Sequence, residues 1–129
     1  MGDVQELRLV LTVTDFDAAV ALYRDARGLE QLEDWSEGDA HIVLLDGGRA
    51  TLEIVDDKQA EKIDAVEVGA RVAGPVRIGF RVSDSAATAD RLKQAGAEQL
   101  AEVVVTPWND RNVRVRVVDG MQLTLFSET

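Results

Sequence analysis

The sequence contains no cysteine, a single histidine (His41) and no long apolar run. The lack of cysteine excludes disulfides, thiolate metal ligands and cysteine nucleophiles. No segment approaches the roughly 20 apolar residues of a membrane span, and the opening "MGDVQELRLV" lacks the charged-then-apolar order of a signal peptide. We therefore expect a soluble, cytoplasmic protein that does not contact a membrane.

Basic residues are outnumbered by acidic ones, 14 Lys and Arg against 24 Asp and Glu, so the formal net charge is −10. The chain lacks the basic footprint that nucleic-acid binding requires, so no nucleic-acid partner is expected. An acidic surface attracts cationic small molecules, although many soluble proteins carry such a charge for solubility alone. Net charge by itself leaves both interpretations open.

The first half of the chain predicts one strand, one helix and three further strands. Leu9, Leu11 and Val13 alternate with more polar neighbours, which is typical of a half-buried strand. Asp15 is placed to cap a helix, and Gly28 is placed to end it. The turn-forming stretches "SEGD" and "DGG" then separate three strands, expected over residues 30–35, 41–45 and 50–55.

The second half repeats this order. A strand over residues 76–83 precedes a helix that Gly96 ends, and strands follow over residues 98–106, 112–118 and 122–126. "GLEQL" at 28–32 matches "GAEQL" at 96–100, and Arg8 matches Arg77. The repeat of about 70 residues indicates a duplicated β-α-β-β-β module rather than a solenoid.

We therefore expect one α+β domain over residues 1–129. Module one covers about residues 5–56 and module two about residues 75–128, and the charged linker at about 57–74 is expected to be partly helical. In each module the apolar face of the sheet should pack on the helix, and the two opposite faces should together form a cup suited to a small molecule. The residues expected to line the cup are Arg8, Val10, Thr12, Thr51, Glu53, Val55, Arg77, Gly79, Arg81, Gln122, Thr124 and Phe126. Asn112, Arg114 and Arg116 should share the lining, or could lie on an exposed face.

Two stretches carry a family resemblance: "LVLTVTDFDAAVALYRDARGLE" in module one and "PWNDRNVRVRVVDGMQLTLF" at the end of module two. With them the chain resembles the vicinal-oxygen-chelate superfamily of glyoxalases, bleomycin resistance proteins and extradiol dioxygenases. The resemblance implies two tandem βαβββ modules that form a cupped mixed sheet with the helices on its outer face. It also implies a homodimer with pockets near the interface.

The resemblance places the metal ligands of metal-dependent relatives at Arg8, Glu53, Arg77 and Thr124. Only Glu53 could bind a metal, because a guanidinium stays protonated and has no lone pair to offer. One carboxylate and one hydroxyl make a poor divalent site, so we expect no metal and no cofactor. Either Arg77 or Arg8 could instead pair with Glu53, or the arginines could lie near a sheet edge and extend into water.

Other side chains are weaker candidates. Trp35 and Trp108 could stack on a planar or cationic ligand, or they could be core or interface residues. His41 could be a polar strand residue, a ligand contact or a general base. The full set of expected ligand-binding residues is Arg8, Trp35, His41, Glu53, Arg77, Arg81, Trp108, Arg114, Arg116, Gln122 and Thr124.

The resemblance and these residues favour a metal-independent protein of the bleomycin-resistance type that sequesters an antibiotic or metabolite in the cup. The enzymatic alternative is a lyase or isomerase of the same superfamily, with Glu53 or His41 as its base and no assigned catalytic residue beyond these two candidates. A structural or regulatory dimer with a filled cup is the third possibility. A metal-dependent glyoxalase or dioxygenase is disfavoured by the residues at the ligand positions.

Overall fold

The computed structural model describes residues 3–129 of the chain. The first module follows the expected order, and its helix continues from a short α-helical segment into a π-helical one. Asp15 caps this helix through its side chain, which accepts from the backbone N–H of Ala18 at 3.0 Å. The elements are β1 (Glu6–Val13), α1 (Phe16–Val20) with the π-helical Ala21–Ala26, β2 (Gln31–Asp34), β3 (Ile42–Asp46) and β4 (Thr51–Asp56).

The second module has the same order, except that the strand expected over residues 98–106 is broken into two short strands. Glu98 lies opposite Arg116, and Val104 lies opposite Asn112. The six residue steps from Glu98 to Val104 therefore lie opposite only four steps of the neighbouring strand, from Arg116 to Asn112. The residues between the two short strands do not take part in the hydrogen-bonded ladder. The elements are β5 (Val76–Arg81), α3 (Ser85–Gln94), β6 (Glu98–Gln99), β7 (Val104–Val105), β8 (Asp110–Arg116), a 3₁₀ turn (Val118–Gly120) and β9 (Gln122–Glu128).

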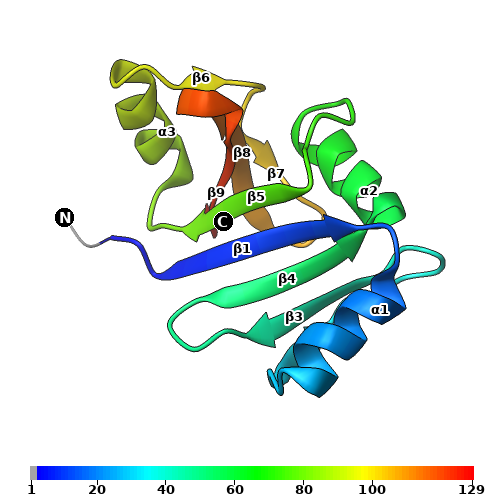
Figure 1. The fold of residues 1–129 in the computed structure, drawn as a ribbon. Coiled ribbons are helices and arrows are strands. Elements are labelled where there is room, and N and C mark those ends of the chain that lie inside the picture. Colours follow the sequence, from blue (N-terminus) through cyan, green and yellow to red (C-terminus); the bar gives the residue numbers. More distant parts are fainter. Residues whose placement is uncertain (1–2) are drawn as a thin grey trace.

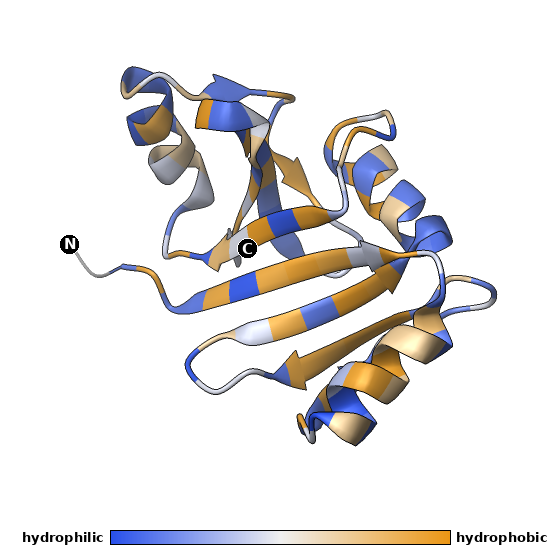
Figure 2. Cartoon of the chain, viewed as in Figure 1, coloured by the Kyte–Doolittle hydropathy of each residue, from blue (hydrophilic) through white to orange (hydrophobic). Residues whose placement is uncertain are grey.

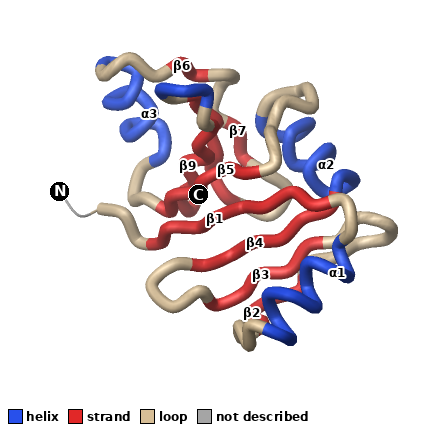
Figure 3. The backbone as a smooth tube through the Cα atoms, in the orientation of Figure 1, coloured by secondary structure: helices blue, strands red, loops and turns tan. Residues whose placement is uncertain are grey.

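All the strands belong to one open mixed sheet with the order β2-β3-β4-β1-β5-β9-β8-β6, in which β7 also pairs with β8 (Figure 1). The modules join through the antiparallel pair β1–β5, which sets Val10 opposite Arg77 and Arg8 opposite Gly79. β4 runs parallel to β1, and β9 runs parallel to β5, so the two halves repeat each other's pairing. Figure 3 shows the strands curving away from the central pair on both sides. The predicted fold class and module order are confirmed.

The helices α1 and α3 cover the outer face of the sheet, as expected. Leu9, Leu11 and Val13 pack with Val20 of α1, and α3 contributes Ala89 to a matching cluster in module two. Hydrophilic bands interrupt the apolar strands β1, β4 and β5 in Figure 2. None of the helices within residues 3–129 has both the length and the apolar composition needed to span a membrane.

A third helix, α2 (Asp57–Glu67), departs from the expectation that the helices lie on the outer face. It lies within the linker, and its Ala60 and Ile63 pack against Val10, Ile42 and Val55. Val10 belongs to the face of β1 opposite Leu9 and Leu11, so α2 occupies the concave side of the sheet. The linker is therefore a wall of the cup.

The C-terminal half of α2 is fixed by a buried ion-pair network. Arg114 of β8 lies 2.9 Å from Asp64 and 3.0 Å from Glu67, and all three side chains are at most 2% exposed. The second carboxylate oxygen of Asp64 accepts from the backbone N–H groups of Val72 and Ala73, both at 2.8 Å. Burial tends to raise the pKa of Asp64, but these backbone donors and Arg114 outweigh it and hold the pKa below its usual range.

We predict that Asp64→Asn destabilises the fold by about 3 kcal/mol, because it removes charge compensation from a buried guanidinium. Urea unfolding measures the loss. Glu61→Gln on the exposed side of α2 is the matched control, and we expect it to change the free energy of unfolding by less than about 0.5 kcal/mol. Equal small effects of the two substitutions would contradict the importance of this network.

Candidate functional site

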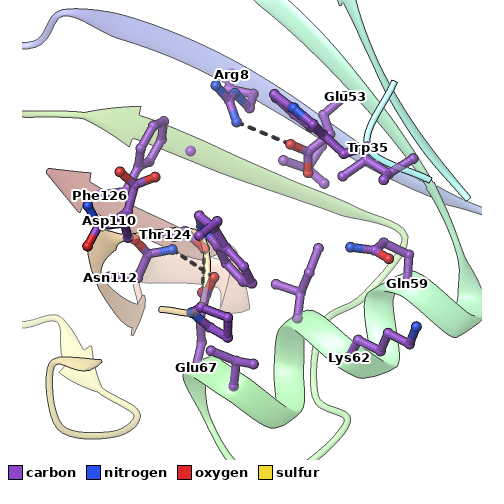
Figure 4. A pocket seen from close by; sticks show the side chains of 18 of the residues that line it. Arg8, Trp35, Glu53, Gln59, Lys62, Glu67, Asp110, Asn112, Thr124 and Phe126 are labelled. Carbon is purple, nitrogen blue, oxygen red and sulfur yellow. Dashed lines mark hydrogen bonds and ion pairs between the residues drawn. The ribbon is translucent and has the colours of Figure 1, made fainter. Parts of the chain in front are cut away.

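A cavity of about 1170 Å³ lies between α2, the concave face of the sheet and the loops that carry Trp35 and Trp108. Both modules contribute to its walls (Figure 4). Gln59 and Lys62 project from α2 on one side, while Phe126 and Asn112 lie on the opposite side. The two halves of the duplicated fold therefore share one site.

The cavity brings together most of the predicted site residues. Seven of the eleven expected ligand-binding residues line it, drawn from β1, β4, β5, β9 and the loops after β2 and β7. They are Arg8, Trp35, Glu53, Arg77, Arg81, Trp108 and Thr124.

Four predicted residues lie elsewhere, each for a visible reason. Arg114 is fully buried among the acids of α2, and Gln122 is held by Arg114 and by the backbone carbonyl of Val72. Arg116 lies further along β8 and pairs with Glu98 at the surface. His41 lies outside the cavity lining, where its Nδ1 is 2.8 Å from Asp56.

Arg8 is the arginine that pairs with Glu53. Its Nη1 donates to Glu53 Oε1 at 3.2 Å, and its Nε lies 2.9 Å from Glu6. The guanidinium carbon also lies 4.9 Å from the ring centroid of Phe126, within the range of a cation–π interaction. A Cβ at Gly79 would come within 3.3 Å of that ring. Glycine thus leaves room for Phe126 beside Arg8.

The Glu53 carboxylate is buried at the sheet side of the cavity. Burial raises the pKa of Glu53 above its ordinary value, although the nearby positive charges of Arg77 and Arg8 oppose the shift. Within residues 3–129, only Oε1 of this carboxylate has a hydrogen-bond donor. Glu53 is therefore a carboxylate beside a cavity with one oxygen left for another partner.

Arg77 repeats the arrangement of Arg8 with a different partner. Its Nη1 donates to Thr124 Oγ1 at 2.6 Å, and Thr124 is the position in β9 that corresponds to Glu53 in β4. The Thr124 hydroxyl also accepts from Arg114 Nε and donates to Glu67, both at 3.1 Å. Arg77 is 7% exposed. The expectation that Arg8 and Arg77 could extend from a sheet edge into water is wrong.

This donor set does not fit a divalent metal. Of the four positions that the resemblance assigns to metal ligands, two hold guanidinium groups, those of Arg8 and Arg77. Glu53 accepts from Arg8, while the Thr124 hydroxyl already makes three hydrogen bonds. No group of three or more His, Cys, Asp or Glu side chains within residues 3–129 is arranged to hold a metal ion.

Asn112 supplies an unsatisfied polar group at the cavity wall. Its Nδ2 donates to Glu67 at 3.0 Å, which fixes the orientation of the amide. Its Oδ1 is buried and accepts no hydrogen bond from residues 3–129. A buried acceptor without a donor is costly, and the bond from Nδ2 to Glu67 is what holds the amide in this orientation.

Sequence reasoning missed the wall formed by α2. Ala60, Ile63, Asp64 and Glu67 have the i, i+3, i+4, i+7 spacing of one buried helical face. The two acids made this buried face hard to recognise from the sequence, because acidic residues in a charged linker are usually exposed. The signal that could have revealed it is Arg114 on a strand flanked by valines, since a buried arginine needs acidic partners from another element.

Comparisons with known proteins agree with this fold. The family model described as "Glyoxalase/Bleomycin resistance protein/Dioxygenase superfamily" matches residues 7–125. No curated protein matches the chain significantly.

Three solved structures illustrate the similarity. A hypothetical protein from Bacillus halodurans C-125 is 14% identical with a TM-score of 0.70, over 95% of this chain and 92% of that one. A methylmalonyl-CoA epimerase from Mycobacterium tuberculosis is 22% identical with a TM-score of 0.67, over 98% and 90%. A Streptomyces coelicolor methylmalonyl-CoA epimerase in complex with 2-nitronate-propionyl-CoA is 20% identical with a TM-score of 0.65, over 98% and 99%. At these identities the likeness concerns the fold alone.

We predict that Arg8→Met destabilises the protein by about 3 kcal/mol at pH 8 and by less at pH 5. Without Arg8, the pKa of buried Glu53 rises further above its unfolded value of about 4.3. A carboxyl whose pKa is higher in the folded state costs stability as the pH rises through that interval, so the penalty grows toward alkaline pH. Urea unfolding at the two pH values measures it.

Arg116→Met, which removes an exposed ion pair, is the control for the loss of an arginine. A penalty for Arg8→Met that does not change between pH 5 and pH 8 would show that the Arg8–Glu53 contact is not an ion pair that depends on ionised Glu53.

Proposed function

This chain belongs to the Glyoxalase/Bleomycin resistance protein/Dioxygenase superfamily, and on that basis we propose that it binds a small organic molecule without a metal ion. The ligand occupies the cavity between α2 and the concave face of the sheet. Enclosure there sequesters a metabolite or antibiotic away from other targets.

The observation that carries the proposal is the combination of an open cavity with side chains already paired at its floor. Arg8 pairs with Glu53, and Arg77 pairs with Thr124, at the four positions that the resemblance assigns to metal ligands. The space beside them is large enough for a drug-sized ligand, for which pockets of about 300–1,000 Å³ are usual.

The walls suit a ligand that combines an aromatic part with a polar part. Trp35 and Trp108 are 44% and 47% exposed although both line the cavity, so each has ring surface free for stacking. At the sheet side, one oxygen of the Glu53 carboxylate has no donor within residues 3–129 and offers an acceptor. Such a mix of apolar area and a few fixed polar groups is typical of small-molecule sites.

We predict that the neutral fluorescent probe N-phenyl-1-naphthylamine binds the folded protein at one saturable site. Trp35→Ala and Trp108→Ala should each weaken binding about tenfold, because each removes an aromatic wall worth roughly 1–1.5 kcal/mol. Probe fluorescence measures binding, and urea unfolding checks that the variants remain folded.

Val118→Ala is the control, because Val118 is exposed and lies outside the cavity lining. Saturable binding that neither tryptophan substitution weakens would place the site elsewhere. The absence of any saturable binding, by this probe or by compounds tested for its displacement, would overturn the proposal.

A second candidate function is an isomerase that moves a proton at a carbon atom. The observation in its favour is Glu53, which is buried beside the cavity with a raised pKa and with one oxygen that lacks a donor within residues 3–129. In this function the Glu53 carboxylate takes a proton from the ligand carbon, and the carboxylic acid so formed returns a proton to the resulting carbanion, which allows exchange with solvent. A raised pKa suits such a base, because it makes the carboxylate a stronger proton acceptor.

Methylmalonyl-CoA in deuterium oxide is the probe for this second function. We predict that the protein exchanges deuterium into the methylmalonyl carbon, followed by NMR, and that Glu53→Gln abolishes the exchange. His41→Gln should leave it unchanged, because His41 lies outside the cavity. Exchange no faster than in protein-free solution would contradict the isomerase function and favour ligand binding without catalysis.

A further inference from the structure

We propose that the ligand carries an anionic oxygen group, such as a carboxylate, and that this group binds the guanidinium of Arg77. The inference rests on the proposed function, because it names the chemical class that the same cavity accepts. It also resolves the conflict between an acidic surface, which attracts cations, and an arginine-rich lining, which attracts anions.

Arg77 lies in the middle of the sheet and has few partners. It is opposite Val10 on β1, its side chain faces the cavity, and it is 7% exposed. Its one hydrogen bond within residues 3–129 goes from Nη1 to the neutral hydroxyl of Thr124. Its Nε and Nη2 have no acceptor among these residues. Neither nitrogen is a fully buried atom that lacks a hydrogen bond, so both border the open space of the cavity.

The carboxylates nearest to Arg77 are held by other groups. Glu53 pairs with Arg8. Glu67 pairs with Arg114 and accepts from Asn112 and Thr124. No carboxylate within residues 3–129 comes within 4.0 Å of the Arg77 nitrogens, whereas the other arginines of the lining, Arg8 and Arg81, both have such a partner.

The duplication explains why this charge is left over. Each module places an arginine on its first strand and directs it at the same position of its fourth strand. Module one has an acid there, Glu53, and module two has Thr124. The second module therefore has the arginine but no acid at the matching position, and the guanidinium of Arg77 is free to bind a negative charge on a ligand.

A ligand carboxylate suits the unpaired side of the Arg77 guanidinium better than a cation suits the nearby acids. The planar guanidinium binds two carboxylate oxygens through parallel N–H groups, and Nε and Nη2 are the pair still available. Beside Arg77, a cation would have to compete with Arg8 for Glu53 or with Arg114 for Glu67, the two carboxylates at the sheet floor of the cavity. The net charge of −10 acts mainly at long range and is screened over about 10 Å at 0.1 M salt, so the local partner decides the preference.

The test compares three probes of similar shape by calorimetry: 1-naphthylacetate, 1-naphthylacetamide and 2-(1-naphthyl)ethylamine. We expect the native protein to bind the acid about tenfold or more tightly than the amide, as a charge-assisted pair requires, and to bind the amine most weakly. Arg77→Met should abolish the preference for the acid over the amide, and Arg77→Lys should keep part of it.

Arg116→Met is the matched control, because it removes one positive charge outside the cavity and should leave the preference unchanged. Equal binding of acid and amide, a preference for the amine, or a preference that Arg77→Met leaves intact would overturn the inference. Binding of the neutral probe N-phenyl-1-naphthylamine would still support the proposed function in those cases. Failure of all four compounds to bind the native protein would overturn both the inference and the proposed function.

Discussion

The buried ion-pair network between Arg114 and the two acids Asp64 and Glu67 determines the shape of this molecule. It ties a helix from the linker to a strand of the second module and thereby gives the open sheet an inner wall. Breaking such a network by removing one partner is expensive, because the remaining charge stays buried. The cavity therefore depends on a contact made outside it, and Glu67 links the two by holding Asn112 and Thr124 from the same carboxylate.

The site is the product of a duplication whose two copies have diverged in charge. Arg8 and Arg77 occupy equivalent places, and each donates to the corresponding residue of its fourth strand. With Glu53 in one copy and Thr124 in the other, these positions do not suit a metal. One guanidinium is neutralised, and the other retains donors toward the cavity. Two very similar modules thus produce an asymmetric floor, with a carboxylate on one side and an uncompensated cation on the other.

Much of the fold could be predicted from the sequence, because it follows from local patterns. Strand alternation placed Leu9, Leu11 and Val13 under α1 and turned Arg8 inward, and the repeat then placed Arg77 in the same way. Less of the site could be predicted. Period-two alternation assigns a face to Arg114 and Arg116 but gives neither the depth of each side chain nor its partner. One is fully buried against α2, and the other pairs with Glu98 at the surface.

The sequence by itself determined the module order and the face on which each strand residue lies, because these depend on residue type and short-range periodicity. Only the tertiary structure decided that Glu53 pairs with Arg8 rather than with Arg77, because that choice depends on how β1, β4 and β5 are placed side by side. It also decided that the linker helix lies inside the cup. The face of α2 that carries Asp64 and Glu67 can be buried only because Arg114, from a strand distant in the sequence, pairs with both acids. No local sequence pattern predicts that contact.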